Sequence, residues 1–327
     1  MIWQSYDTHP PVAYVTKEQA RLCHFLGRVP SNDKPFIKEI EHVLMVPRLS
    51  RNYAAMLREA PRIEQEFRSE NCKAIFGAAD CVLRQVACHI DTSGMEDKLH
   101  LVLTAYLDQP DNTYEHTGPF TILTISNKFW GRGIPLAIEV FRALREKYGR
   151  NVQMKLVCED VPADYPLVEG LELIRVHQLS SNLRYRLYRE ADIFLLLGLM
   201  QFGVILEAMA HGVPTVSTSG CNKGGWILSG QTGLIVEPPF YHYDESFGTE
   251  WKTWSQFCDI VKTRFEHGDL SYMITEAIAH VEFLMNNPDQ LKKMGQAAQK
   301  LQREKHSFEV RNTQIRQIYT EILERIP

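Results

Sequence analysis

Two short segments in the second half of the sequence combine residue types that suit the binding of an anion. The first, NKFWGRG at 127–133, carries Lys128 and Arg132 beside two glycines and precedes a helical pattern. The second, MQFGVILEAMAH at 200–211, also starts a helix at a glycine, and Glu207 is its only acid. Backbone N–H groups at a helix start attract anions, and the planar guanidinium of arginine can bond two phosphate oxygens at once. Together the two segments predict a site for a diphosphate.

Each segment has a separate role in this prediction. Lys128 and Arg132 approach the diphosphate from one side, and the N–H groups of the turn at 203–205 approach it from the other. Glu207, one helical turn further on, can accept hydrogen bonds from vicinal hydroxyls such as those of a ribose. Taken alone, each feature has a simpler explanation: cations beside glycines occur on many surfaces, and Glu207 can be a helix-face acid bonded to nearby backbone. Their order and spacing favour the binding site.

The elements that must position these residues alternate between strands and helices. Such alternation, with helices of this length, predicts a parallel, doubly wound sheet, in which the carboxyl ends of the strands share one edge. We expect strands at 120–126, 152–159, 171–177, 192–198 and 233–238, and helices at 134–149, 180–191, 271–286, 288–305 and 307–326.

The first part of the chain has a less regular pattern. Short runs at 12–15, 42–46 and 101–107 look like strands, and 63–80 has a helical pattern, so a second, smaller α/β lobe is expected there. The polar, turn-rich stretch at 108–119 marks the boundary.

We therefore expect two domains, 1–118 and 119–327, with the final helices able to cross back to the first. The aromatic insertion at 238–257 is expected to be a loop packed on the body, with a lid or a partner surface as the alternative.

Composition and charge exclude several classes of protein. Apolar content is 44%, charged content is 23% and the net charge is −4, which gives no general attraction to nucleic acid. The seven cysteines contain no C-x-x-C pair, so reduced thiols are expected, not a disulfide framework or a zinc site. The first residues lack the layout of a signal peptide, and the apolar run at 193–200 is far shorter than the ~20 residues of a membrane span. We expect a soluble, cytoplasmic protein with no transmembrane segment.

The order of these motifs resembles the donor-binding domain of retaining GT-B glycosyltransferases, the family named glycosyl transferases group 1. FGVILEAMAHGVPTVSTSG at 202–220 is similar to the core motif of that family, and VHQLSSNLRYRLYREADIFLLLG at 176–198 and SGQTGLIVEPP at 229–239 are similar to the segments on either side. The family has a G-R-x-x-x-x-K-G turn where this chain has NKFWGRG, with Arg132-Gly133 in the Lys-Gly place and Lys128 beside Asn127. The resemblance runs from about residue 119 to the C-terminus.

The resemblance implies a GT-B fold of two Rossmann-like domains, with a donor-binding C-terminal domain and an N-terminal domain that is short and looks incomplete. It implies a retaining glycosyltransferase of the hexosyltransferase class, moving a sugar from a UDP- or GDP-linked donor to a carbohydrate, glycan or lipid-linked acceptor. In the family, retention is attributed to attack on the same face, with the leaving diphosphate taking the proton of the acceptor. Cations then stabilise the leaving group, so we expect no metal and no cofactor. A homodimer or a partner subunit is left open, and no nucleic acid is expected.

The resemblance also assigns roles to particular residues. The family keeps a pair of glutamates, E-x7-E, of which Glu207 matches the second, the ribose-binding one. In the place of the first stands Leu199, or Met200 if the alignment has a gap, and Gln201 is the nearest polar side chain. The residues predicted to act in catalysis are Lys128, Arg132 and Gln201. Those predicted to bind the donor are Asn127, Gly133, Phe202, Gly203, Val204, Ile205 and Glu207.

The missing first glutamate and the short N-terminal lobe leave an alternative function open. The chain would then be a nucleotide-sugar-binding homologue, catalytically weak or inactive, that acts as a partner subunit. A third reading, a sugar-phosphate synthase or phosphorylase on the same fold, has no residue that distinguishes it.

Overall fold

The computed structural model describes residues 21–26, 34–41, 43, 46, 53–111, 118–198, 202–219, 226–239 and 254–326. The chain divides into two compact units. The N-terminal unit comprises Met1–Thr104, Tyr243–Lys252 and Arg311–Pro327, and the C-terminal unit comprises Ala105–His242 and Thr253–Val310. The predicted domain limits, 1–118 and 119–327, rest on composition and stay a prediction.

A six-stranded parallel sheet forms the centre of the C-terminal unit, in the order β10-β9-β8-β5-β6-β7. Every residue of β8 and β9 is buried, as expected for strands of a parallel sheet that is covered on both faces. The predicted doubly wound sheet is thereby confirmed. The strands are β5 (Phe120–Ile125), β6 (Val152–Val157), β7 (Leu171–Ile174), β8 (Ile193–Leu196), β9 (Thr215–Thr218) and β10 (Gly233–Val236).

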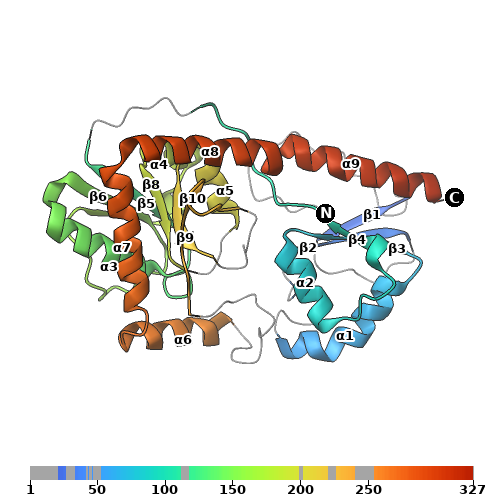
Figure 1. Ribbon diagram of the computed structural model, residues 1–327. Helices are drawn as coiled ribbons and strands as arrows, with labels where there is room; N and C mark the ends of the chain where they lie inside the picture. The colour runs from blue at the N-terminus through green and yellow to red at the C-terminus, as the bar shows by residue number, and fades with distance from the viewer. Residues whose placement is uncertain are drawn as a thin grey trace. The chain divides into compact units, whose positions relative to one another are not determined.

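Helices cover this sheet, and three pairs of them pack together: α3 with α7, α5 with α8, and α7 with α8 (Figure 1). Helix α4 begins after Ser180, whose Oγ accepts a hydrogen bond from the Leu183 N–H at 3.2 Å, as the serine predicted. The helices are α3 (Ile134–Tyr148), α4 (Ser181–Arg189), α5 (Phe202–Ala210), α6 (Trp254–Glu266), α7 (Ser271–Asn286) and α8 (Pro288–His306). Short 3-10 turns lie at Gly149–Asn151 and Val176–Gln178.

The N-terminal unit contains a smaller parallel sheet in the order β1-β2-β3-β4. Its strands are β1 (Cys23–Leu26), β2 (Phe36–Ile40), β3 (Cys72–Gly77) and β4 (Leu99–Leu101), and its helices are α1 (Tyr53–Arg68), α2 (Asp80–His89), a 3-10 turn (Glu96–Lys98) and the part of α9 (Phe308–Arg325) from Arg311 onward. The helical pattern expected over 63–80 is wrong in its second half, because β3 begins at Cys72. A short apolar run suits a buried strand as well as a helix, so periodicity alone does not separate the two. Both units are therefore α/β and built on parallel sheets, as the expected two Rossmann-like domains require.

Helix α9 completes the core of the N-terminal unit. Successive side chains of β2 point to opposite sides of the sheet: Glu39 contacts Arg311 of α9 at 2.6 Å, and Lys38 contacts Glu66 of α1 at 3.0 Å. Both charged residues of this strand are therefore paired. The apolar contact between α9 and the sheet joins Ile318 and Ile322 to Ile37, Ala74, Phe76 and Val102.

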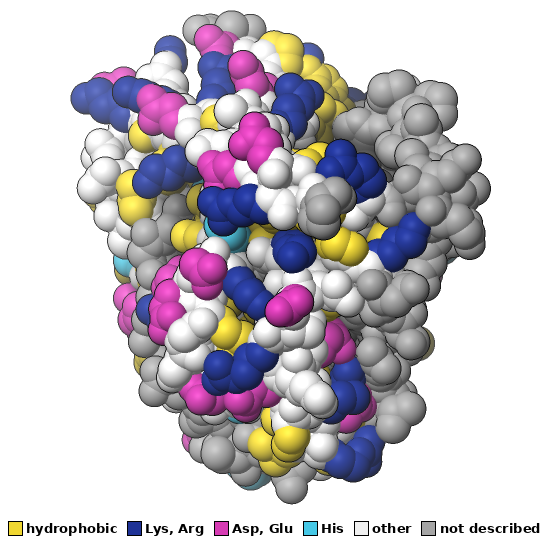
Figure 2. All heavy atoms as spheres, turned by 90° about the vertical axis from the view of Figure 1, so that its right-hand side faces the viewer, with side chains coloured by type: hydrophobic (Ala, Val, Ile, Leu, Met, Phe, Trp, Pro, Cys, Tyr) yellow, Lys and Arg dark blue, Asp and Glu magenta, His cyan; other side chains and the backbone are white. Residues whose placement is uncertain are grey.

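Among the described side chains in Figure 2, Lys and Arg are interspersed with Asp and Glu. The described part of the chain contains no helix long and apolar enough to span a membrane. Six of the seven cysteines lie in that part, and all six are free thiols.

Candidate functional site

The two strands that precede the predicted anion-binding segments separate at their carboxyl ends. The ladder between β5 and β8 covers only Ile122↔Ile193 and Leu123↔Phe194, whereas on its other side β5 pairs with β6 along its whole length. Beyond the short ladder, the Thr124 hydroxyl donates to the Leu195 carbonyl at 2.7 Å. The chain runs from β5 outward to β6 and then returns to β8 on the opposite side, so the order of strands reverses here. Ligands of open α/β sheets bind at such a reversal.

The turn between β5 and α3 touches the end of β8 through backbone atoms. Gly133 has a φ of +66° and caps the N-terminus of α3, and a Cβ there would lie 2.4 Å from the Leu197 carbonyl. A Cβ on Gly198 would lie 1.9 Å from the Arg132 carbonyl carbon. Both positions therefore require glycine. The structure thus places the backbone of Arg132 against Gly198, two residues after the end of β8.

Lys128 is directed by an ion pair toward the loop after β6. Its Nζ lies 2.7 Å from Asp160 Oδ2, and both side chains are about half exposed. The hydrogen bond and the charge of Asp160 raise the pKa of Lys128. Asn127, before it, is exposed. Lys128 is therefore a fully charged cation at the rim of the site.

Helix α6 adds a thiol that the sequence did not indicate. Burial raises the pKa of Cys258, although the Gly131 backbone N–H and the charges of Arg132 and Lys128 favour its thiolate. The thiol therefore lies close to the glycine turn and to both cations.

At the start of α5, Gly203 has free space around it among the described residues. Gly203 is exposed, and a Cβ placed on it would meet no atom within 4 Å in the described structure. Val204 and Ile205 turn their side chains into the core, and the Val204 carbonyl accepts a hydrogen bond from Tyr188 Oη at 3.2 Å. Phe202 begins the helix, and its side chain is not described. Gln201, like Leu199 and Met200, lies outside the described residues.

Glu207 is buried and holds an arginine that sequence reasoning missed. The residue is 1% exposed, and its two carboxylate oxygens accept hydrogen bonds from Arg184 Nε at 2.7 Å and from Arg184 Nη2 at 2.6 Å. Burial raises the pKa of Glu207, and the charge and hydrogen bonds of Arg184 and Tyr188 offset only part of that rise. Arg184 and Tyr188 are four residues apart on α4, so they share one helix face. That spacing is the one sequence signal that could have drawn attention to Arg184.

Aromatic rings fill the space around this ion pair. His211, at the end of α5, bonds the Glu207 carbonyl through Nδ1 at 2.8 Å and stacks on Tyr188 with ring centroids 5.1 Å apart. Tyr185 packs edge-on against the same imidazole. Burial lowers the pKa of His211, which favours the neutral ring.

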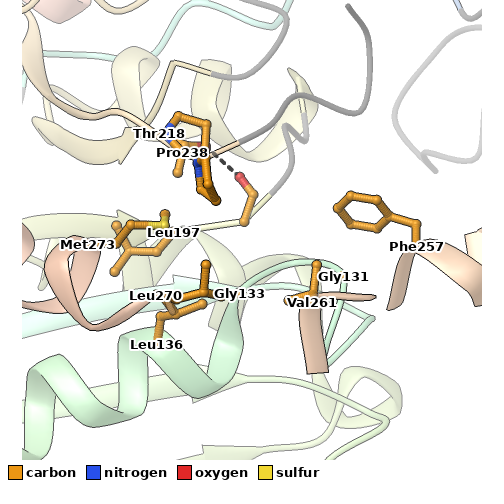
Figure 3. A pocket seen from close by; sticks show the side chains of 12 residues that line it. Gly131, Gly133, Leu136, Leu197, Thr218, Pro238, Phe257, Val261, Leu270 and Met273 are labelled. Carbon is orange, nitrogen blue, oxygen red and sulfur yellow. Dashed lines mark hydrogen bonds between the residues drawn. The ribbon is translucent and has the colours of Figure 1, made fainter. Parts of the chain in front are cut away.

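An apolar pocket lies beneath the glycine turn (Figure 3). In that view Phe257 of α6 and Met273 of α7 face the pocket from opposite sides, and the Thr218 hydroxyl of β9 donates to the Gly198 carbonyl at 2.7 Å. The other lining residues are Gly131, Gly133, Leu136, Leu197, Pro238, Pro239, Val261 and Leu270. The pocket beside the turn therefore has a lining of glycine backbone and mostly apolar side chains.

Residues 119–241 match the model of the family described as Glycosyl transferases group 1. The lipopolysaccharide glucosyltransferase WaaG of Escherichia coli (strain K12) is 27% identical over 124 residues, which are 36% of this chain and 33% of that protein. The resemblance to group 1 glycosyltransferases is thereby confirmed for the region that contains the candidate site.

Solved structures share the fold at low identity. A mutant of TarM from S. aureus, in complex with Fondaparinux, alpha-GlcNAc-glycerol and UDP, is 12% identical with a TM-score of 0.61, covering 88% of this chain and 51% of that one. Sucrose-phosphate synthase from Thermosynechococcus elongatus is 12% identical with a TM-score of 0.59, covering 90% and 69%. HepE of Anabaena in complex with UDP-glucose is 12% identical with a TM-score of 0.52, covering 88% and 72%. The chain matches one third of the curated relative and spans about half of the TarM chain.

Proposed function

We propose that this protein is a retaining glycosyltransferase, which moves a hexose from a nucleotide-diphosphate sugar to a hydroxyl acceptor without a metal ion. The match of residues 119–241 to group 1 glycosyl transferases supports the reaction class. The named complexes of TarM with UDP and of HepE with UDP-glucose favour a uridine donor over a guanosine one. The name of the lipopolysaccharide glucosyltransferase WaaG, and the complex of the TarM mutant with Fondaparinux, favour a glycan or lipid-linked acceptor. The proposal also places the protein in the cytoplasm.

One observation carries the proposed site: the backbone contact between the Arg132–Gly133 turn and the Leu197–Gly198 end of β8. It brings the backbone of the turn that carries Arg132 against the residues that follow β8, where the order of strands reverses. Neither Gly133 nor Gly198 tolerates a side chain, so the contact is a rigid feature of the fold. A diphosphate placed there would meet Arg132 on one side and the N–H groups of Gly203, Val204 and Ile205 on the other.

In the proposed reaction the cations stabilise the leaving diphosphate. A charge-assisted hydrogen bond from Arg132 is worth about 1.5–3 kcal/mol. Lys128 must share or leave Asp160 to reach a phosphate. That change is cheap, because a half-exposed ion pair contributes about 0–1 kcal/mol. The leaving diphosphate itself then takes the proton of the acceptor hydroxyl, so the proposal needs no metal to stabilise the departing charge.

The remaining predicted residues have supporting roles in this proposal. Asn127 and Gly133 line the turn against the phosphates, Phe202 begins the helix that meets them, and Gln201 contacts the transferred sugar. The predicted contact of Glu207 with a ribose would require Arg184 to give up its position on the carboxylate, because both oxygens are already bonded to that arginine.

The Arg184–Glu207 ion pair favours a second candidate function. A carboxylate already bonded through both oxygens binds a ribose less readily, and Leu199 and Met200 replace the acid that relatives keep nearby. The protein would then bind a nucleotide sugar with little or no turnover and serve as the partner subunit of an active transferase.

Incubation with UDP-, GDP- and ADP-hexoses separates the two functions. A transferase releases nucleoside diphosphate by slow donor hydrolysis even without an acceptor, and proton NMR shows the released sugar first in the anomeric configuration of the donor. Binding of a donor in a thermal-shift assay without any release supports the partner subunit instead. Release of the opposite anomer rejects the retaining mechanism.

A further inference from the structure

Both oxygens of the Glu207 carboxylate, which a ribose would need as hydrogen-bond acceptors, are already bonded within the protein. Arg184 places one N–H on each carboxylate oxygen, at 2.7 and 2.6 Å. The side chain of Glu207 is 2% exposed and that of Arg184 is 23% exposed. The guanidinium is therefore the half of the pair that faces the solvent.

This bonding pattern resembles the one that vicinal hydroxyls require. A ribose offers its 2′- and 3′-hydroxyls as two adjacent donors, and an acidic residue receives such hydroxyls through its oxygens, as it receives the fork of an arginine. Arg184 and a ribose therefore compete for one position on Glu207.

The surroundings of the pair favour the arginine. Tyr188 is fully buried beside Glu207. The buried His211 ring stacks on Tyr188, and His211 Nδ1 bonds the Glu207 carbonyl. Neutral hydroxyls bond a carboxylate more weakly than a guanidinium does, so a ribose replaces only part of what the departing arginine loses.

We propose that Arg184 determines ribose specificity: it occupies the diol-binding face of Glu207, so the protein holds a nucleotide by its diphosphate and discriminates little on the ribose hydroxyls. This inference rests on the proposed nucleotide-sugar function. It predicts a site that accepts deoxyribose and dideoxyribose nucleotides, and whose ribose recognition increases when the arginine fork is removed.

Isothermal titration calorimetry with UDP, GDP and ADP and with their 2′,3′-dideoxy counterparts tests the inference. For the base that binds, we expect the wild type to hold both forms within about threefold in Kd, which is below the contribution of one net hydrogen bond. Arg184→Lys keeps the charge but loses the fork, and Arg184→Gln loses both. In these variants we expect the ribose form to bind at least about tenfold more tightly than the dideoxy form.

Arg186→Lys is the matched control on α4, because Arg186 is exposed and pairs only loosely with Glu190, at 3.7 Å.

The inference is overturned if the wild type already binds the ribose form at least about tenfold more tightly than the dideoxy form. It is also overturned if the ratio of the two Kd values is the same in the wild type and in all variants. The wild-type ratio decides this even if a substitution at Arg184 prevents folding, which circular dichroism reports. If none of the three diphosphates binds to the wild type or to a folded variant, the proposed function fails and the inference fails with it. If a nucleoside diphosphate binds but the ratio of the two Kd values is unchanged by the Arg184 substitutions, only the inference fails and the proposed function stands.

Discussion

Gly133 and Gly203 flank the proposed diphosphate site, and the structure requires only one of them. Gly133 has positive φ and backbone atoms 2.4 Å from the position of a Cβ, whereas a Cβ on Gly203 would enter open space. A glycine that packing does not require, at an exposed helix start, leaves room for a ligand to approach the backbone.

We expect Gly133→Ala to lower the free energy of unfolding by about 2–4 kcal/mol, because both the strained φ and the clash with Leu197 must be relieved. Gly203→Ala should change it by less than about 1 kcal/mol, and any change should be a gain. The same Gly203→Ala change should weaken the binding of UDP about tenfold, because the added methyl group lies where the phosphates approach. Urea unfolding and calorimetry measure the two effects. Tight UDP binding by Gly203→Ala would remove α5 from the diphosphate site.

The buried His211 gives the stability a pH dependence of known sign. Burial lowers its pKa in the folded state below the unfolded value of about 6.5, so the unfolded chain binds more protons between these two values. The contribution of His211 to the free energy of unfolding is therefore fully present above pH ~6.5. It is lost as the pH falls from ~6.5 to the folded-state pKa, by up to about 1.4 kcal/mol per pH unit.

The raised pKa of Glu207 acts in the opposite direction, so only a comparison with a variant isolates the histidine. Replacing His211 with Phe keeps a ring against Tyr188 and removes the titrating group. We expect urea unfolding of His211→Phe to show a flatter dependence of stability on pH between about 5 and 6.5. Equal slopes for both proteins would show that the imidazole is already free to take up a proton in the folded state.

Helix α8 holds the far end of the helix that carries Glu207. A Cβ on Gly295 would lie 2.1 Å from the Gly212 carbonyl oxygen, so α8 and the end of α5 touch at the backbone. Gln299, one turn further along α8, donates to the Ala210 carbonyl at 2.7 Å and thereby satisfies one of the free carbonyls at the end of α5. The position of α5 in the site therefore depends on a helix far along the sequence.

Gly295→Ala should lower the free energy of unfolding by about 1–3 kcal/mol despite the better helix propensity of alanine, because the two backbones must separate. Gln296→Ala, at the exposed neighbouring position of α8, should change it by less than about 0.5 kcal/mol. Chemical denaturation of the two variants side by side provides the measurement. If Gly295→Ala is as stable as Gln296→Ala, the close contact does not hold α5.

At the scale of elements, the strands of the C-terminal unit and its described helices other than α6 could be predicted because they are apolar runs and helical periods bounded by glycine, proline and polar turns. Helix α6 (Trp254–Glu266) was not predicted, and it begins inside the stretch 238–257 that was expected to be a loop. Strand β3 could not, since CKAIFG at 72–77 is too short for its period to distinguish strand from helix. The Arg184–Glu207 pair could not be predicted either, because it joins two helices that only the tertiary fold brings together. Lys128 and Arg132 could be proposed from the sequence because glycines next to cations at a helix start are typical of an anion-binding turn, and their role stays a prediction.

At the scale of the whole molecule, the end of the chain is part of the N-terminal unit. Arg311 of α9 bonds the carbonyls of Val102 and Leu103 at 3.0 and 2.9 Å in addition to Glu39. Burial opposes the ionisation of Glu39, but its bonds to His24 and Arg311 outweigh that effect and lower its pKa. The first sheet and the last helix therefore form one folding unit.

Arg311→Ala should lower the free energy of unfolding of the N-terminal unit by about 2–4 kcal/mol, because Glu39 and two carbonyls lose a charged partner. Arg316→Ala, at an exposed position of the same helix, should stay within about 0.5 kcal/mol of the wild type. Hydrogen exchange of β2 and β3 amides localises the effect. Unchanged protection in Arg311→Ala would mean that the apolar contacts of α9 suffice without the ion pair.

The central claim, a nucleotide diphosphate held at the Arg132–Gly133 turn, is tested most directly by calorimetric titration of wild-type protein, Arg132→Ala and Arg150→Ala with UDP and UDP-glucose. Arg150 is an exposed arginine in the turn that precedes the amino end of β6, so it controls for the loss of one positive charge. We predict that wild type and Arg150→Ala bind with similar Kd and that Arg132→Ala binds at least about tenfold more weakly, the loss of one charge-assisted bond. Equal binding by Arg132→Ala and the wild type would contradict the account.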